Sequence, residues 1–257
     1  MMLWGTVFAA AVAAAAWRAC ALTADGAVAA WIVGSATFGA GGWPAAAVLF
    51  AFFIPSALLS RVGKTRKRAL TDVGKHGPRD ARQVFANGGV AAVCALFATS
   101  GQAIFAAAFA GAFAAAAADT WATEIGVLSP ESPRSILTFR PVATGLSGGV
   151  TVAGTIASVA GAMLVAAVAQ AGGVAPFVPV AIAGIVGSLA DSAVGAALQA
   201  LRWCPACDRP CETNPHSCGS ATHLRRGLAW MDNDAVNLIA TLKGACLAAI
   251  IVAILRG

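Results

Sequence analysis

The feature that most constrains this chain is a series of long, uninterrupted apolar segments. A helix needs about 20 apolar residues to cross the hydrocarbon core of a bilayer. Segments of roughly this character occur at residues 3–22, 26–41, 43–60, 84–99, 101–118, 145–170, 175–198 and 234–254. Their apolar residues are continuous and do not alternate with polar ones, which favours helices over a transmembrane barrel. The sequence therefore predicts an all-α, polytopic membrane helix bundle of about eight transmembrane helices, forming one integral membrane domain over residues 1–257.

The number of spans depends on two short segments. Residues 26–41 and 84–99 are short for a bilayer. Gly39, Gly41, Gly42 and Pro44 are typical of a broken or re-entrant helix. A count of six to eight therefore fits the sequence. Residues 3–22 lack a preceding basic region and a polar sequel, so we expect a retained span there and not a secretory signal.

Composition agrees with a lipid environment. Hydrophobic residues make up 59% of the 257 positions and charged residues 11%, whereas a soluble domain carries about 25% charged residues. The 28 glycines suit membrane helices, whose backbones pack closely through small residues.

Positive charges gather in alternate loops. Eight Lys and Arg residues lie in the basic loop (residues 61–83), two lie in residues 134–140, and four lie in the Cys/His loop (residues 199–232). With eight spans, all three loops fall on one side, which the positive-inside rule makes cytoplasmic, and both termini fall outside. We expect the plasma (inner) membrane of a prokaryote. The net charge of +6 is thus a topology signal, and no soluble basic surface for nucleic acid is indicated.

The basic loop leads directly into polar residues at the mouth of a span. Its cations Lys64, Arg66, Lys67, Arg68, Lys75, Arg79 and Arg82 are followed by Gln83, Asn87, Gly88 and Gly89. Anchoring of the loop at the membrane surface would explain the cations alone. Amides and paired glycines are costly in lipid, yet they suit a place where backbone N–H groups approach an anion.

Carboxylates lie in or beside several spans. Asp191 is well inside an apolar span, on one face with Gly184, Gly187 and Gly195. A carboxylate at this depth costs roughly 2.5 to 3.5 kcal/mol, which makes it a functional-site hypothesis, with an ion pair to Lys243 as the structural alternative.

Two other acidic segments are candidates. Asp119 and Glu124 follow the end of an alanine run. They fit either a packed site or a solvated helix cap. Asp232, Asn233, Asp234 and Asn237 open the last span, where capping needs only one of them.

Glycines precede the span at 145–170. Gly145, Gly148, Gly149 and Gly154 suit either close helix packing or a helix N-terminus that faces phosphate. No strand is expected before them, so the nucleotide-binding glycine fingerprints do not apply.

The Cys/His loop contains enough soft ligands for one tetrahedral zinc ion. Cys204, Cys207, Cys211 and Cys218 are accompanied by His216 and His223. In a reducing cytoplasmic loop, structural zinc or plain thiols are favoured over disulfides, although the spacing matches no standard zinc finger.

Together these groups can hold a divalent cation and a polyanion at the membrane surface. Mg²⁺ takes oxygen ligands and bridges phosphates, and Lys and Arg neutralise the remaining charge. The residues therefore predict a magnesium-dependent enzyme that acts on a phosphate or alcohol headgroup of a lipid.

Five motifs, in order, carry a resemblance to a known family: "RQVFANGG", "ADTWATEIG", "GLSGGVTVAG", "GSLADSAVGAALQ" and "DNDAVNLIAT". The chain from about residue 35 to 247 resembles an integral membrane family that includes the plant phytyl phosphate kinase and the animal transmembrane protein nineteen. The resemblance implies transfer of a phosphoryl group from a nucleoside triphosphate, CTP or ATP, to a prenyl monophosphate such as phytyl phosphate.

The resemblance also implies the site residues. Those carried over by position are Asn87, Asp119, Glu124, Asp191, Asn233, Asp234 and Asn237, with Lys64, Lys67, Arg79 and Arg82 as phosphate contacts. Asp119, Asp191 and Asp234 are expected to bind Mg²⁺, and Glu124 to be either a ligand or an orienting group. Two other functions use the same residue types: transport of an anionic or phosphorylated lipid, and nucleotidyl transfer from CTP to a lipid.

Overall fold

The computed structural model describes residues 2–68, 70, 72–73 and 77–256, and it is predominantly helical. The helices are α1 (Met2–Arg18), α2 (Ala24–Leu59), α3 (Lys64–Arg68), α4 (Ala81–Ala98), α5 (Ala103–Gly126), α6 (Val152–Ala171), α7 (Phe177–Leu198) and α8 (Asn233–Arg256). The strands are β1 (Arg134–Ser135), β2 (Gly149–Val150), β3 (Leu201–Cys204), β4 (Arg209–Cys211) and β5 (His223–Arg226).

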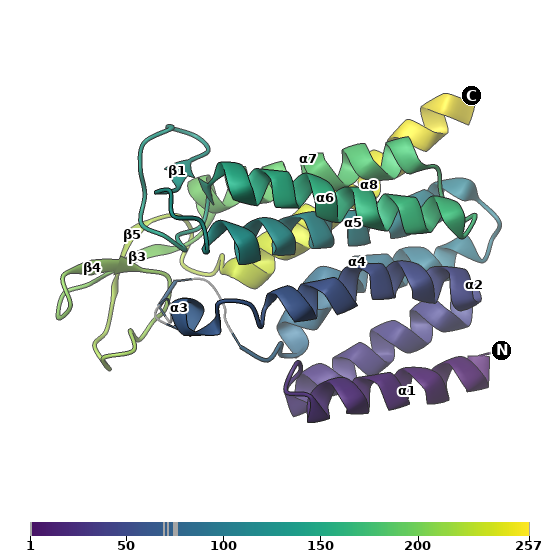
Figure 1. The fold of residues 1–257 in the computed structure, drawn as a ribbon, viewed down its shortest axis with the longest axis horizontal. Helices are drawn as coiled ribbons and strands as arrows, with labels where there is room; N and C mark the ends of the chain where they lie inside the picture. Colours follow the sequence, from purple (N-terminus) through teal and green to yellow (C-terminus); the bar gives the residue numbers. More distant parts are fainter. Residues whose placement is uncertain (1, 69, 71, 74–76, 257) are drawn as a thin grey trace.

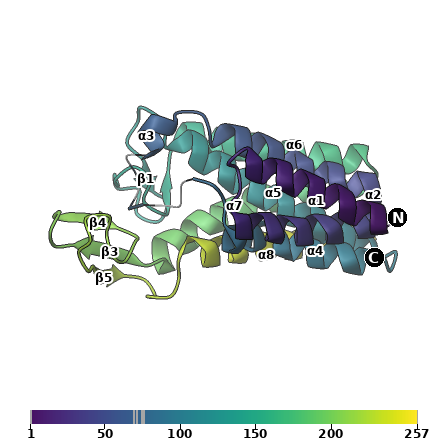
Figure 2. The same ribbon diagram turned by 90° about the horizontal axis from the view of Figure 1, so that it is seen from below.

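The long helices confirm the predicted membrane bundle. In the described residues, six helices are long and apolar enough to cross a membrane: α2, α4, α5, α6, α7 and α8. Helix α1 is apolar but shorter. These helices run side by side, with the charged loops at one end of the bundle (Figure 1, Figure 2).

Helix α2 is two antiparallel halves and not one long span. Gly42 interrupts it with φ 59° and ψ −150°, a conformation that glycine adopts readily. Phe8 of α1 contacts both Phe38 and Phe50, at ring-centroid distances of 5.7 and 6.1 Å. A straight helix would separate those two residues by about 18 Å. The chain therefore reverses at Gly42 (Figure 1), in agreement with the separate spans predicted at 26–41 and 43–60. The two halves of α2, together with α1, α4, α5, α6, α7 and α8, make eight segments.

Helix α5 forms the centre of the bundle, and small residues allow its neighbours to approach. It is buried continuously from Ala107 to Ala118. A Cβ atom at Gly111 would lie 2.6 Å from the carbonyl oxygen of Gly244 in α8, and one at Gly184 in α7 would lie 2.8 Å from the Cβ of Ala114. In lipid no hydrophobic effect drives helices together, so close packing at such small residues stabilises the bundle instead.

Two predicted boundaries were wrong. Helix α5 continues to Gly126, so Asp119 lies within a helix and does not cap its end. Helix α6 begins only at Val152, where Thr151 accepts a hydrogen bond from the Gly154 N–H at 3.0 Å. Gly145 has a φ of +90°, outside the helical region, so residues 145–149 form a loop before the helix.

The loops at the charged end contain the only strands in the described residues. In the Cys/His loop, β4, β3 and β5 form an antiparallel sheet in that order. Strands β1 and β2 pair in the segment between α5 and α6. The basic loop contains the short helix α3, and its residue Lys75 lies outside the described residues. Both termini lie at the opposite end of the bundle (Figure 1).

Candidate functional site

A cavity of about 870 Å³ lies at the charged end of the bundle, where the spans meet the loops. Its walls come from α2, α4, α5, α6, α7 and α8 and from the loops around residues 61–79 and 144–151. It brings together most of the predicted site residues: Lys64, Lys67, Arg79, Asn87, Asp119, Glu124, Gly148, Gly149, Asp191, Asn233 and Asn237. Residues up to 173 positions apart in the sequence, Lys64 and Asn237, therefore share one space.

Asp119 and Asp191 form the acidic centre of this cavity. Asp119 projects from α5 and Asp191 from α7, and their carboxyl groups lie within hydrogen-bonding reach of each other. The Oδ1 atom of Asp191 is buried and has no hydrogen-bond partner among the residues that the structure describes. Two carboxylates this close repel each other unless a proton or a cation lies between them. The pair is therefore suited to a bound cation.

Glu124 is neutralised by the protein itself. Its Oε2 lies 2.5 Å from the Nζ of Lys67, and its Oε1 accepts a hydrogen bond from the Ser60 hydroxyl. The Lys67 ammonium also donates to the carbonyl oxygen of Leu59 at 2.8 Å. Because both carboxylate oxygens are engaged, Glu124 is an anchor between α5 and the end of α2, and Lys67 is part of that anchor.

Two more of the predicted cations, Lys64 and Arg79, line the cavity, as does Arg61. Lys64 is exposed and makes no hydrogen bond or ion pair with any described residue. Arg79 lies above the rings of Phe52 and Phe53, at 5.7 and 6.0 Å from their centroids. Burial lowers the pKa of the Arg79 guanidinium, and the Glu124 carboxylate opposes this shift. An arginine remains protonated under such conditions, so Arg79 supplies a fixed positive charge.

The glycine loop, residues 145–149, forms the part of the wall next to α7. A Cβ atom at Gly148, where φ is +80°, would lie 2.3 Å from the Cβ of Ala196. Only glycine fits both this backbone conformation and this contact. The Ser147 N–H donates to Glu212 Oε1 at 2.7 Å, and Gln199 Nε2 donates to Glu212 Oε2 at 3.0 Å. Glu212 thus ties the glycine loop to the Cys/His loop.

Amide side chains complete the polar lining. Asn87 on α4 donates to the carbonyl oxygen of Gln83 at 2.9 Å. Asn233 and Asn237 enter from the first turns of α8. Ser158 of α6 donates to Ser188 of α7 at 3.0 Å, in the wall shared by those helices.

Three predicted site residues lie outside the described cavity lining. Arg82 is 70% exposed and pairs with Asp232 at 2.8 Å and with Asp234 at 3.8 Å. Asp234 is buried beside that arginine and is not in the described cavity lining, whereas Asp119 and Asp191, with which it was predicted to bind Mg²⁺, line the cavity. Gly88 faces α2, where a Cβ atom would lie 3.0 Å from Val33 Cγ1. Helical spacing predicted which faces were polar, but not the rotation of α8 relative to α7.

The alternative ion pair of Asp191 with Lys243 is also not formed. The Lys243 side chain is exposed, and its charge acts on Asp191 without a direct contact among the described residues. Sequence reasoning missed Ser60, Ser158, Ser188 and Glu212. The sequence did contain signals for them: serine hydroxyls in or beside apolar spans, and a carboxylate next to Cys211. None of these indicates a role in the site until its hydrogen-bond partner is known.

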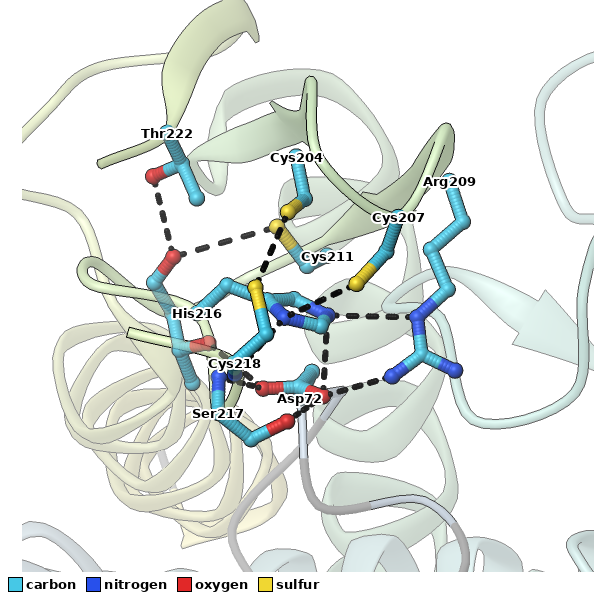
Figure 3. A network of polar contacts seen from close by, with 10 residues as sticks. Asp72, Cys204, Cys207, Arg209, Cys211, His216, Ser217, Cys218 and Thr222 are labelled. Carbon is cyan, nitrogen blue, oxygen red and sulfur yellow. Dashed lines mark hydrogen bonds and ion pairs between the residues drawn. The ribbon is translucent and has the colours of Figure 1, made fainter. Parts of the chain in front are cut away.

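The Cys/His loop gathers four potential ligands outside the cavity. The ligand atoms of Cys204, Cys207, His216 and Cys218 all lie within 4.8 Å of one another (Figure 3). Cys211, which was predicted as a ligand, is not in this group, because its Sγ donates to the Thr213 carbonyl oxygen at 3.8 Å. His216 takes its place.

Local hydrogen bonds give these thiols different pKa values. Hydrogen bonds from Ser220 lower the pKa of the Cys218 thiol to about 6, while the hydrogen bond with Cys218 raises the pKa of Cys207 to about 11. Burial raises the pKa of Cys211. With a pKa of about 6, Cys218 is mostly a thiolate near neutral pH.

The fold and this cavity define the class of the protein: a multi-pass helical membrane protein with a polar, carboxylate-containing cavity between its spans. The chain belongs to the integral membrane protein family DUF92, whose family model matches residues 7–245. That match covers every residue that lines the cavity.

Relatives with similar sequences come from archaea and plants. The chain is 32% identical to the uncharacterized membrane protein MJ0933 of Methanocaldococcus jannaschii, over 79% of this chain and 74% of that protein. It is 29% identical to Protein PGR of Arabidopsis thaliana, over 97% of this chain and 95% of that protein. It is 25% identical to the chloroplastic protein VTE6 of Arabidopsis thaliana, over 88% of this chain and 64% of that protein. No solved structure matches the chain significantly.

Proposed function

We propose that this protein is a membrane-embedded kinase that transfers a phosphoryl group from a nucleoside triphosphate to a prenyl monophosphate, giving the diphosphate. The observation that carries the proposal is the pairing of Asp119 and Asp191 in a cavity that also presents Lys64, Arg79 and the glycine loop. Membership of the family, together with the motif resemblance to the phytyl phosphate kinase, supports this reaction class.

Asp119 and Asp191 fit a magnesium site. Both offer the hard oxygen ligands that Mg²⁺ prefers, and the buried Oδ1 of Asp191 lacks a protein partner among the described residues. Held by these two carboxylates, Mg²⁺ would offset the negative charge of the phosphates. Asp234 is left out of this proposed ligand set because it lies against Arg82.

The positive groups fit two phosphorylated substrates. Lys64 and Arg79 would neutralise phosphate oxygens, and the amides of Asn87, Asn233 and Asn237 would fix their orientation. The acceptor is itself an ionised phosphate, so the protein needs no dedicated general base. Positioning and charge neutralisation then supply most of the catalysis.

A second, apolar cavity beside the polar site would take the part of the acceptor's lipid chain nearest the phosphate. It measures about 80 Å³ and is lined by apolar residues of α1 and α2, among them Phe8, Phe38 and Phe50. Arg79, Gln83 and Asn87 line both cavities. A molecule with a phosphate headgroup and an apolar tail could therefore lie across this shared wall.

The proposal is tested by the reaction itself. Purified protein in detergent is incubated with Mg²⁺, with ATP or CTP, and with phytyl, geranylgeranyl or farnesyl monophosphate, and the product is identified by mass spectrometry. We expect the diphosphate, and a loss on the order of 100-fold or more in Asp191→Asn. Glu131→Gln removes an exposed carboxylate from a loop beyond the described cavity lining and is the matched control.

Other products would contradict the kinase and identify the alternative. A lipid joined to the nucleotide would show nucleotidyl transfer. No product with any pair of substrates, accompanied by movement of a prenyl phosphate across vesicles that contain the protein, would show transport. Equal activity in Asp191→Asn and Glu131→Gln would exclude the proposed metal site.

A further inference from the structure

The Cys/His loop, which the proposed reaction does not use, contains a four-ligand cluster with the dimensions of a zinc site. Tetrahedral zinc with Zn–S bonds of about 2.3 Å and Zn–N bonds of about 2.0 Å places neighbouring ligand atoms about 3.5 to 3.8 Å apart. The Sγ atoms of Cys204 and Cys218 are 3.6 Å apart, and Cys207 Sγ lies 3.8 Å from His216 Nδ1. These two distances agree with the spacing of ligand atoms around a tetrahedral zinc ion.

The histidine is oriented as a zinc ligand. His216 Nδ1 lies 3.8 Å from Cys207 Sγ and accepts a hydrogen bond from the Cys218 backbone N–H at 3.2 Å, so it is the unprotonated ring nitrogen. Because Nδ1 has a single lone pair, zinc would take the place of this weak hydrogen bond. His216 Nε2, on the far side of the ring, lies 3.0 Å from the Asp72 carboxylate (Figure 3). A carboxylate that accepts this second N–H fixes the tautomer in which Nδ1 can bind metal.

Arg209 competes for the same histidine nitrogen, with its Nε 3.1 Å away. Only one of the two arrangements can hold, because Nε2 either donates to Asp72 or accepts from Arg209. The carboxylate is the better partner for the N–H. Arg209 keeps its own bond to Asp72 Oδ2 at 2.9 Å, so the guanidinium remains in place either way.

The cluster offers four protein ligands, as structural zinc sites do. Cys204 and His216 are buried, at 0% and 2% exposure, whereas Cys207 and Cys218 are exposed. Four protein side chains fill all four positions of a tetrahedron, whereas a catalytic zinc site keeps one open for water. The cluster also lies apart from the cavity that contains Asp119 and Asp191, because none of its four residues is in the described lining.

The contacts around the cluster lead to the cavity wall. Asp72 belongs to the basic loop; its carboxylate accepts bonds from Ser217, and its carbonyl oxygen accepts from the Glu212 N–H at 2.7 Å. Burial would raise the pKa of Asp72, but these hydrogen bonds outweigh burial and hold the pKa below its usual value. Glu212 in turn holds the glycine loop through Ser147.

We propose that Cys204, Cys207, His216 and Cys218 bind one structural Zn²⁺, with Asp72 as the partner that orients His216. The ion fixes the Cys/His loop, and through Glu212 it holds the glycine loop against the cavity. Zinc binding itself does not depend on the kinase reaction, so the two proposals fail independently.

Metal content tests the ligand set. Full-length protein, purified in detergent without added chelator, is analysed for zinc by mass spectrometry. We expect one zinc ion per chain, and loss of the metal in Cys207→Ser. Cys211→Ser is the matched control, because Cys211 lies in the same loop and its thiol is outside the cluster. Zinc retained in Cys207→Ser, or lost equally in Cys211→Ser, would overturn the assignment.

Two measurements on the unaltered protein remain valid if a variant fails to fold. Exchange with Co²⁺ should give the intense visible absorption of tetrahedral cobalt together with sulfur-to-cobalt charge-transfer bands. Zinc should also be released when a thiol-specific reagent blocks the cysteines. A Cys204–Cys218 disulfide in protein that contains no zinc, found by alkylation and peptide mapping, would show a redox pair and contradict the metal site.

The proposed link to the cavity is tested by hydrogen exchange. Removal of zinc with a strong chelator should speed exchange at least about tenfold in residues 204–218 and at the Ser147 amide, whose partner Glu212 is then released. Exchange that rises only in residues 204–218 would leave the zinc site in place and exclude its effect on the glycine loop.

Discussion

At the residue scale, the buried Lys67–Glu124 pair differs from the other acids of the cavity, because the protein itself neutralises the Glu124 carboxylate. The two side chains are 4% and 15% exposed, and Ser60 and the Leu59 carbonyl complete their hydrogen bonds. Asp191 is the opposite case, with a buried oxygen that no described group satisfies. The difference separates an anchor from a candidate ligand, although both acids line the same cavity.

The anchor gives the first prediction. Lys67→Met leaves the Glu124 carboxylate buried without its cation, which costs about 3 to 5 kcal/mol when a buried pair is broken on one side. We expect a clear fall in the unfolding temperature in detergent, measured by tryptophan fluorescence. The double variant Lys67→Met/Glu124→Gln should recover part of it, because the orphaned charge is removed.

A matched control comes from the same loop. Lys64→Met removes an exposed ammonium that has no partner among the described residues, so its unfolding temperature should match that of the unaltered protein. If Lys67→Met and Lys64→Met behave alike, the pair does not stabilise the fold.

At the scale of elements, the glycine loop shows how a backbone conformation sets the shape of the cavity. Gly148 must adopt a positive φ and must also allow α7 to approach. Gly173, in the link before α7, has a φ of +66° but nothing within 4 Å of a Cβ atom. The two glycines therefore differ in packing and not in backbone strain.

This difference gives a paired prediction. Both Gly148→Ala and Gly173→Ala cost about 1 to 2 kcal/mol for the left-handed backbone. Only Gly148→Ala also forces the loop away from Ala196 and deforms the cavity wall. We expect Gly148→Ala to lose most phosphoryl transfer and Gly173→Ala to keep it, measured with the diphosphate assay at a temperature where both remain folded. Equal activities would mean that the loop does not form part of the active cavity.

At the scale of the whole molecule, the reversal of α2 at Gly42 makes the number of crossings even. All three charged loops then lie at one end of the bundle and both termini at the other (Figure 1). With the positive-inside rule, this arrangement predicts cytoplasmic loops and termini outside the cytoplasm.

Reporter fusions in a bacterial host test this orientation. Alkaline phosphatase, which is active only outside the cytoplasm, should be active when fused after Arg256 or after Ser100 in the link between α4 and α5. A fusion within the Cys/His loop should be inactive. Activity in the loop fusion with none at the C-terminus would reverse the orientation, and termini on opposite sides would mean that α1 does not cross.

The sequence by itself determined the membrane bundle, its approximate spans and the end at which the charged loops gather. These properties depend on local hydrophobicity, length and charge, which act over one segment at a time. The same reasoning identified Asp191, because a carboxylate inside an apolar helix is costly wherever the helix packs. Asp119 was predicted from its place at the end of an alanine run.

Only the tertiary structure decided which polar groups meet. Asp234 lies against Arg82 instead of joining the other aspartates, Glu124 is neutralised by Lys67, and His216 replaces Cys211 in the cysteine cluster. Helical periodicity fixes the face of a residue on its own helix, but the rotation and depth of that helix are set by close packing at small residues such as Gly111 and Gly184. Partners that come from distant segments are therefore defined by packing and not by spacing along the chain.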